Sequence, residues 1–353
     1  MRILLTGHKG YIGSIMGPML VAKRHEVIGL DSDLFESCTF GEPGDELPFI
    51  RKDIRDIEHA DLHGFDAVIH LAGLSNDPLG NLNPKLTYEI NHQASVRLAR
   101  LAKDAGVTRF LFSSSCSTYG AAGDTMLDES AAFSPVTPYA HSKVLVEQDL
   151  AQLADANFSP TFLRNATAYG LSPWMRFDLV LNNLVAWACS TGRIYIKSDG
   201  TPWRPIVHIE DISRAFVAAL AAPRESIHNQ PFNVGRTEEN YRIRELAEIV
   251  KDTVPGCTIE YAPDASPDKR CYRVDFSRIR TALPGFQPEW DARAGAAQLH
   301  EAYKRIGVTV EEFEGPRYKR IDHVQKLMSD GTLDSNLRWK ISPSQALAGS
   351  QVS

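Results

Sequence analysis

The sequence has little of what marks a membrane protein, a disulfide-rich protein or a metalloprotein. No apolar run approaches the ~20 residues needed to cross a bilayer, and the opening MRILLTGHKG lacks the features of a secretory signal. The five cysteines are scattered and include no CxxC pair, which argues against a disulfide framework and a zinc site. We therefore expect a cytoplasmic protein that contacts no membrane and holds no metal.

An excess of positive charge is also missing. The 44 acidic side chains outnumber the 38 basic ones and give a net charge of -6, so there is no sign of nucleic-acid binding. Any anionic ligand must then be held by a few basic residues at its own site. A hydrophobic share of 43% is ordinary for a globular protein, and 353 residues exceed what one compact core usually holds. Two packed lobes are expected.

The first half of the chain alternates short apolar runs with helical patterns. RILLTG, HEVIGLD, DAVIHLAG, RFLFSSS and PTFLRNA are predicted strands, and long helices are predicted at about residues 87–105 and 139–153. Such alternation predicts an α/β fold, a Rossmann doubly wound parallel sheet with right-handed crossovers. We expect a Rossmann domain over residues 1–170, which later elements rejoin, a smaller α+β substrate lobe over 171–340, and a disordered tail over 341–353.

A glycine-rich turn, GHKGYIG, follows the first predicted strand and opens a helix. In this GxxGxxG spacing the first glycine allows a tight turn, the second lets the backbone approach a pyrophosphate, and the third lets helix and strand pack closely. The helix N-terminus offers free N–H groups to phosphates. The turn therefore predicts a dinucleotide site, with cofactor contacts from Gly7, Lys9, Gly10, Tyr11, Ile12 and Gly13.

Asp31 ends the second predicted strand, where a carboxylate can bind both ribose hydroxyls of NAD and would repel a 2′-phosphate. No arginine or lysine follows in DSDLFES, so NAD is favoured over NADP. Asp53 and Ile54 follow the third strand, where adenine would lie. The small residues of HLAG permit close approach to the adenosine half, which adds Leu71, Ala72 and Gly73 to the expected cofactor contacts.

Tyr139 and Lys143 form a YxxxK pair, and positions i and i+4 share one helical face. A free tyrosine has a pKa of about 10, so a base near neutral pH needs preferential stabilisation of the phenolate by about 4 kcal/mol. Lys143 and the positive nicotinamide of NAD+ are expected to lower the pKa of Tyr139 in this way. Ser115, at the end of the fifth strand, would hydrogen-bond the reacting hydroxyl.

The glycine turn, Asp31, HLAG, Asn91 on the long helix, SSSCSTYG and PYAHSK occur in one order and spacing. Over about residues 1–300 this order resembles the extended short-chain dehydrogenase/reductase family, above all its NAD-dependent sugar-nucleotide epimerases and dehydratases. The resemblance implies catalysis by Ser115, Tyr139 and Lys143, and cofactor-site roles for Asn91 and Ser113. It also implies a homodimer that pairs the two long helices.

The substrate lobe carries further points of resemblance. Asn182 and Asn183 resemble an NNL segment that holds the sugar diphosphate, and Arg204 resembles an arginine that grips it. Either Arg270 or Arg273 would be the second clamp, since guanidinium groups suit a diphosphate. The expected substrate is thus a nucleotide-diphosphate sugar. Where the pattern departs from the family, Thr167 and Ser117 are further candidate contacts, and the polar run Ser75, Asn76 and Asp77 either touches sugar hydroxyls or forms a turn.

The residues after Ser115 narrow the reaction. The resemblance implies that a dehydratase would carry an acidic pair there, whereas this chain has Cys116 and Ser117. Strand alternation should turn Cys116 away from the site, as a buried structural cysteine. The remaining Ser/Tyr/Lys set suits a 4-epimerase or an NAD(H)-dependent dehydrogenase or ketoreductase, and the NAD preference favours the epimerase. A non-catalytic NAD-sensing interaction protein is a third reading. Residues 314–340 lie beyond the resemblance and receive no functional assignment.

Overall fold

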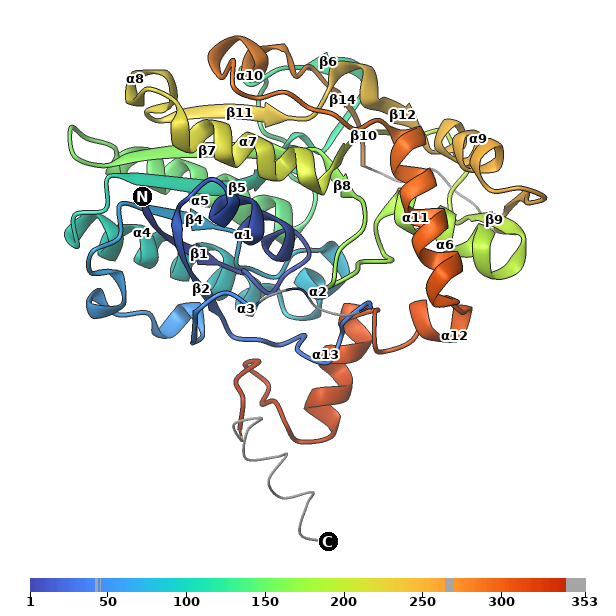
Figure 1. The fold of residues 1–353 in the computed structure, drawn as a ribbon, viewed down its shortest axis with the longest axis horizontal. Coiled ribbons are helices and arrows are strands. Elements are labelled where there is room, and N and C mark those ends of the chain that lie inside the picture. The colour runs from blue at the N-terminus through green and yellow to red at the C-terminus, as the bar shows by residue number, and fades with distance from the viewer. Residues whose placement is uncertain (42–43, 45, 264–269, 341–353) are drawn as a thin grey trace, which may run out of the picture.

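A computed structural model describes residues 1–340 except 42, 43, 45 and 264–269. Its centre is a seven-stranded, wholly parallel sheet in the order β11-β7-β5-β4-β1-β2-β3 (Figure 1). The predicted Rossmann α/β fold is confirmed. The strands are β1 (Arg2–Thr6), β2 (Glu26–Asp31), β3 (Phe49–Arg51), β4 (Ala67–His70), β5 (Arg109–Ser115), β7 (Ser159–Asn165) and β11 (Gln230–Val234).

The central strands are buried on both faces, as their continuous apolar sequences require. In β1, Ile3 and Leu5 face one core while Leu4 faces the other. Helices α1 (Gly13–Ala22) and α7 (Ile209–Ala221) cover the first face, and α4 (Ala94–Asp104) and α5 (Pro138–Leu153) cover the second. Strand order reverses between β1 and β4, which opens a crevice at their carboxyl ends, where ligands bind in open α/β sheets.

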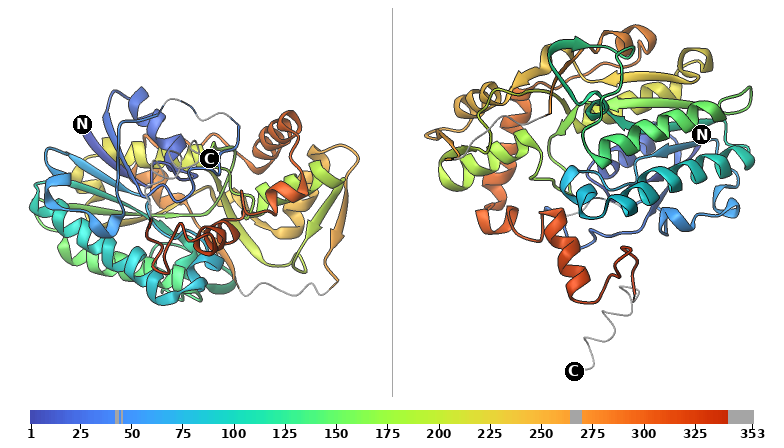
Figure 2. Two further views of the ribbon diagram at one scale, coloured as in Figure 1. Left: turned by 90° about the horizontal axis from the view of Figure 1, so that it is seen from below. Right: turned by 180° about the vertical axis from the view of Figure 1, so that it is seen from behind.

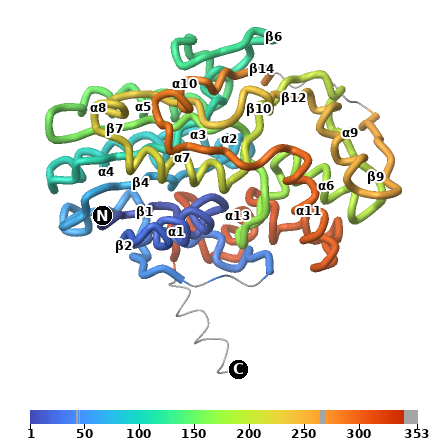
Figure 3. The backbone as a smooth tube through the Cα atoms, turned by 45° about the horizontal axis from the view of Figure 1, so that its top comes forward, coloured from blue at the N-terminus to red at the C-terminus, as the bar shows by residue number. Residues whose placement is uncertain are grey.

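A second lobe lies beside the sheet domain (Figure 3). It has its own apolar core, built from helices and two small sheets in the orders β12-β10-β8 and β13-β9. Its helices are α6 (Val180–Thr191), α9 (Ile243–Thr253) and α11 (Ala292–Ile306), and its strands are β8 (Thr167–Tyr169), β9 (Arg193–Ile196), β10 (Trp203–His208), β12 (Asn240–Arg242) and β13 (Thr258–Tyr261). Later elements return to the first lobe, since β11 pairs with β7 in the main sheet and α7 packs on one face of it.

The helix expected over residues 87–105 is not uniform. It consists of α3 (Pro84–Tyr88), a π-helical turn η3 (Glu89–Gln93) and α4. Single π turns inside helices occur frequently at functional sites. Here the turn holds Asn91, whose side chain is buried under the crevice.

The chain ends in a segment that crosses the underside of the molecule (Figure 2). Helix α13 (Arg320–Ser329) lies there, and the chain then continues to Lys340 against the loops after β2 and β3. The buried side chains Val324, Leu333 and Leu337 join the core below the sheet. The tail predicted over residues 341–353 lies outside the described residues. Within the described part of the chain, no helix is long and apolar enough to cross a membrane.

Candidate active site

A cavity of about 700 Å³ occupies the crevice at the carboxyl ends of β1, β2, β4 and β5, and the second lobe supplies its other wall. Nearly every residue predicted for the site lines it. These are Gly7, Lys9, Gly10, Tyr11, Ile12, Gly13, Asp31, Asp53, Ile54, Leu71, Ala72, Gly73, Ser75, Asn76, Asp77, Ser113, Ser115, Ser117, Tyr139, Lys143, Thr167, Asn183, Arg204 and Arg270. Three predicted contacts, Asn91, Asn182 and Arg273, are not part of the lining.

The glycine turn has the shape that a pyrophosphate needs. A Cβ on Gly7 would lie 2.8 Å from the Ala72 nitrogen, and one on Gly13 would lie 2.2 Å from the Gly7 oxygen. These two glycines are required by the protein's own packing. A Cβ on Gly10 would meet only the Gly7 oxygen, at 3.0 Å, so the remaining space above Gly10 is left for a ligand. The residues therefore fit a dinucleotide bound against the N-terminus of α1.

The carboxylate of Asp31 is held in place by two backbone N–H groups, from Lys9 at 3.1 Å and Asp33 at 2.9 Å. Burial raises the pKa of this carboxyl group, and the two backbone hydrogen bonds oppose that rise. The ammonium of Lys9, which could have attracted a 2′-phosphate, instead pairs with Asp33 at 3.0 Å and Glu46 at 3.2 Å. This arrangement suits the free ribose hydroxyls of NAD.

Asn91 was expected among the cofactor-site residues, and its side chain does not line the cavity. Its amide lies one layer below the cavity, where Oδ1 accepts from the Leu74 backbone N–H at 2.7 Å and Nδ2 donates to the Leu74 carbonyl at 3.0 Å. The loop after β4 bends at the predicted contact Gly73, the residue before Leu74. Asn91 therefore positions that loop rather than lining the site.

The three predicted catalytic side chains meet at the cavity. Ser115 ends β5, while Tyr139 and Lys143 lie one turn apart on α5, which begins at Pro138 after the capping Thr137. The Lys143 ammonium donates to the Ser113 carbonyl at 2.7 Å and lies 5.7 Å from the centre of the Tyr139 ring. Burial lowers the pKa of Lys143 to about 8.

The pKa of Tyr139 does not fall in the protein alone, contrary to the expectation from the sequence. Burial raises it, and the Asp77 carboxylate adds to the rise. The guanidinium of Arg176 and the hydroxyl of Ser115 act in the opposite direction, whereas Lys143 is not among the groups that shift it. The burial of the phenol thus outweighs the positive charges that the chain itself supplies.

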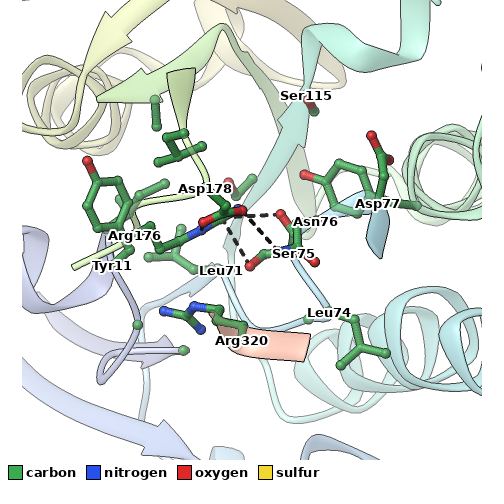
Figure 4. Close-up of a pocket in the computed structure, with 18 of the residues that line it drawn as sticks. Tyr11, Leu71, Leu74, Ser75, Asn76, Asp77, Ser115, Arg176, Asp178 and Arg320 are labelled. Carbon is green, nitrogen blue, oxygen red and sulfur yellow. Dashed lines mark hydrogen bonds and ion pairs between the residues drawn. The ribbon is translucent and has the colours of Figure 1, made fainter. Parts of the chain in front are cut away.

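Arg176 and Asp178 form a pair that the sequence gave no reason to expect. Their side chains lie in the middle of the cavity, 2.6 Å apart, with Ser75 and Asn76 facing them (Figure 4). Arg176 donates to the Ser75 carbonyl at 3.2 Å, and Asn76 donates to Asp178 at 3.0 Å. Burial would raise the pKa of Asp178, but Arg176 lowers it to about 2. The pair fixes the polar run that follows β4.

The substrate-lobe predictions divide into lining and supporting residues. Arg204 is buried at the cavity wall, and the guanidinium of Arg270 lies 2.6 Å from the Asp77 carboxylate. Arg270 is therefore the cavity residue of the two alternatives, because the Arg273 guanidinium stacks 4.6 Å from the Trp203 ring.

Asn183 lines the cavity, but its neighbour Asn182 is fully buried and donates to the Tyr11 phenol at 2.9 Å. Asn182, which was expected to contact the substrate, therefore lies behind the cavity wall. On α6 adjacent residues point in different directions, so only one of two neighbouring asparagines can face the ligand.

Cys116 has the structural role expected of it. Its side chain is fully buried, Sγ donates to the Arg164 carbonyl at 3.1 Å, and burial raises the thiol pKa well above its usual value. Ser117 lies on the cavity side of the same segment. At the end of β5 the cavity is therefore lined by Ser115 and Ser117 and not by an acidic pair.

Two functional candidates, Arg176 and Arg320, were missed by the sequence analysis. Both line the cavity, from a loop after β8 and from α13 respectively. Neither lies within a recognisable motif, and their positions depend on how distant segments pack. Leu337, from the end of the chain, lines the cavity as well.

Comparisons with known proteins agree with this geometry. The profile of the family described as "NAD dependent epimerase/dehydratase family" matches residues 3–235. The chain is 31% identical over 322 residues to a UDP-glucose 4-epimerase of Mycolicibacterium smegmatis, with 86% of this chain and 99% of the relative covered. It is 29% identical over 336 residues to a UDP-glucose 4-epimerase of Neisseria meningitidis serogroup A, with 85% and 95% covered.

Among solved structures, the fold is similar to that of DesIV, a dTDP-glucose 4,6-dehydratase from Streptomyces venezuelae with NAD bound. The TM-score is 0.75 at 26% identity, and the match covers 88% of this chain and 100% of DesIV. The similar proteins thus include enzymes of both epimerase and dehydratase type.

Proposed function

Because this chain belongs to the NAD dependent epimerase/dehydratase family and NAD is its cofactor, we propose that it is a 4-epimerase of a uridine-diphosphate hexose. The named relatives at 29–31% identity are UDP-glucose 4-epimerases and are covered almost from end to end, which supports this choice. We propose UDP-glucose and UDP-galactose as the first pair to test.

One observation carries the choice of epimerase over dehydratase. The cavity brings together Ser115, Tyr139 and Lys143, while the two residues after Ser115 are a buried thiol and a serine. A dehydratase needs a further acid and base to eliminate water, in addition to the three residues that oxidise the sugar. These three residues are sufficient for an epimerase, in which the sugar is oxidised, the keto-sugar rotates in the pocket, and its other face is reduced.

The proposed mechanism assigns one task to each side chain. Bound NAD+ supplies the hydride acceptor and a positive charge beside the phenol. Tyr139 takes the proton of the sugar C4 hydroxyl, which Ser115 orients by a hydrogen bond. Arg176 adds positive charge near the phenolate, while Lys143, held by the Ser113 carbonyl, is assigned to cofactor binding on the same helical face. Tyr139 returns its proton when the other face of the sugar is reduced.

The nucleotide half of the substrate is assigned to the opposite wall. Arg204 and Arg270 offer guanidinium groups to the diphosphate, and Asn183 and Thr167 line the same region of the second lobe. Asp77 holds Arg270 at 2.6 Å, so the clamp is oriented before substrate arrives.

The decisive experiment incubates the purified protein with UDP-glucose or UDP-galactose and follows conversion by chromatography and by the absorbance of reduced nicotinamide. An epimerase gives the same mixture from either sugar with no net NADH. Net NADH would instead indicate a dehydrogenase, and a 4-keto-6-deoxy product a dehydratase. We expect Tyr139→Phe to lower turnover by about a thousandfold or more while NAD stays bound, because only the proton transfer is removed. NAD binding without any turnover of nucleotide sugars would favour the NAD-sensing reading.

We also propose that the protein works in the cytoplasm as a homodimer paired through α4 and α5. Its five cysteines are all unpaired thiols, which suits a reducing compartment. Sedimentation equilibrium would test the dimer, and charge substitutions at the exposed Arg97 and Arg100 on α4 should weaken it if that helix is the interface.

A further inference from the structure

The cavity wall is completed by the end of the chain. We call residues 316–340 the C-terminal strap, which lies beyond the part that the family profile matches. Two of its side chains, Arg320 and Leu337, line the same cavity as Gly10 and Asp31. The strap is therefore part of the dinucleotide site by position.

The strap is fastened to the loops that hold the adenosine side of that site. His323 Nε2 lies 3.1 Å from the Leu34 carbonyl, and Trp339 Nε1 donates to the Ser32 carbonyl at 2.7 Å. Further along, the Arg338 guanidinium pairs with Asp53 at 3.5 Å. All three anchors are on the loops after β2 and β3, close to the carboxylates predicted to face ribose and adenine.

Arg320 is a cavity cation that the carboxylates of Asp178 and Asp31 stabilise through their charge but not through a hydrogen bond. It makes no hydrogen bond or ion pair with any residue that the structure describes, and its guanidinium instead lies 4.0 Å from the centre of the Phe35 ring. Figure 4 shows Arg320 in the cavity, below Arg176 in that view. Burial and the nearby Arg176 lower the pKa of Arg320 to about 10.

These contacts leave the N–H donors of Arg320 without a hydrogen-bond acceptor among the described residues, beside the glycine turn. Asp178 pairs directly with Arg176, whereas Asp178 and Asp31 act on Arg320 only through their charge. A desolvated guanidinium that lacks an acceptor is costly unless a ligand supplies one. The ligand must be anionic, and the nearby N-terminus of α1 favours a phosphate group at the same point.

We propose that Arg320 binds the pyrophosphate of NAD and that the C-terminal strap closes over the adenosine half, so that the cofactor is retained between turnovers. The proposal rests on NAD as the cofactor and not on the identity of the sugar. An epimerase regenerates its NAD+ in each cycle and does not need to exchange it. A segment that covers the cofactor is therefore consistent with the proposed epimerase. Release of NAD then requires the strap to detach.

The test compares nucleotide affinities of Arg320→Met with those of the unaltered protein, by calorimetry on protein freed of bound nucleotide. We expect NAD+ and ADP-ribose to bind about 10- to 100-fold more weakly, since a hydrogen-bonded charge is lost, and adenosine to bind unchanged. Lys326→Met is the matched control, because Lys326 is an exposed cation on the same helix that pairs with Asp330 at 2.5 Å. It should leave all three affinities unchanged.

Three outcomes would overturn the proposal. Weaker UDP binding with unchanged NAD+ binding would assign Arg320 to the substrate. A larger loss for NADP+ than for NAD+ would assign it to a 2′-phosphate, and unchanged binding of every nucleotide would leave it no ligand. None of these readings depends on turnover, so they are distinct from a failure of the epimerase assignment.

A second pair of variants covers the case in which Arg320→Met does not fold. Arg320→Lys keeps the charge but loses the fork of donors. It should weaken NAD+ binding by about fivefold to tenfold, which is about the value of one hydrogen bond. Trp339→Phe keeps the ring but removes the hydrogen bond to Ser32, and it should speed the release of NAD severalfold in a dilution experiment. Unchanged affinity in the first and unchanged release in the second would together refute the proposal.

Discussion

The phenol of Tyr11, in the glycine-rich turn, donates a hydrogen bond of 2.6 Å to the backbone carbonyl of Gly170, at the start of the substrate lobe. The Asn182 amide donates to the same phenol at 2.9 Å. The cofactor turn and the substrate lobe are thus joined at a buried point, although 159 residues separate the two partners. This junction fixes the distance between the two halves of the cavity.

The first prediction concerns this junction. Tyr11→Phe leaves the Gly170 carbonyl without its donor inside the protein, so we expect the free energy of unfolding to fall by about 1–3 kcal/mol. Tyr261→Phe is the control, because the Tyr261 side chain is exposed, and it should change stability by less than about 0.5 kcal/mol. Denaturant titrations of the nucleotide-free protein measure both. Equal stability of the two variants would mean that the junction does not hold the lobes.

The second prediction concerns the charge beside the catalytic phenol. Arg176 lowers the pKa of Tyr139, so its loss should raise that pKa. A base with a higher pKa is deprotonated only at higher pH, and the acidic limb of the kcat/KM profile should move upward by about one pH unit in Arg176→Gln. Asp178→Asn breaks the same ion pair but keeps the positive charge, and it should not move the limb upward. An upward shift in both variants would point to a structural effect.

The third prediction separates two glycines of one turn. A methyl group on Gly13 would lie 2.2 Å from backbone oxygen, and we expect Gly13→Ala to lose about 3 kcal/mol of stability. In Gly10→Ala the methyl group meets little protein, so stability should fall by less than about 1 kcal/mol, while NAD+ affinity falls about tenfold or more. Thermal unfolding and calorimetry measure the two effects. A Gly10→Ala protein that binds NAD+ normally would exclude this turn as the pyrophosphate site.

The fourth prediction concerns acid stability through His208. Its Nδ1 accepts the Glu210 backbone N–H at 3.2 Å and so must be unprotonated, and burial lowers its pKa to about 4. The usual value is 6.5, so between pH 6.5 and 4 the unfolded chain binds more protons than the folded one. Stability should therefore fall as the pH drops through this window, by up to about 3 kcal/mol from this group.

His208→Asn tests that assignment, because asparagine can cap α7 but does not titrate in this range. The variant loses the stack on Trp290 at 4.0 Å and should be less stable at pH 7. Its free energy of unfolding should nevertheless depend less steeply on pH between 6.5 and 4. Parallel pH curves for the two proteins would rule out His208 as the titrating group.

Much of the fold and the catalytic set could be predicted because their signals are local. The glycine turn, Asp31, and the Tyr139–Lys143 pair each lie within one short segment whose geometry follows from a strand end or a helical turn. The sequence did not show which residue of each pair lines the cavity, Asn182 or Asn183, and Arg270 or Arg273. The answer depends on which face of the helix or strand points inward. That orientation is set by packing between lobes and is not encoded in the motif itself.

Arg176 and Arg320 could not be predicted for a different reason. Each reaches the cavity from a segment that is brought there by contacts across more than a hundred residues, such as the Arg176–Ser75 and His323–Leu34 hydrogen bonds. The direction of the Tyr139 pKa shift in the protein alone could not be predicted for a related reason. Burial raises this pKa, and the degree of burial exists only in the folded cavity. Side chains near in space but far in sequence leave no periodic signal.

The order of the sheet strands and the strap along the chain has a consequence for biosynthesis. A protein emerges from the ribosome amino end first, so GHKGYIG is exposed early, whereas the sheet gains its last strand only with Gln230–Val234. The lining is finished later still, when Arg320 and Leu337 have left the exit tunnel. A chain cut between Val234 and Arg320 would therefore retain all seven strands of the main sheet but lack two side chains of the cavity lining.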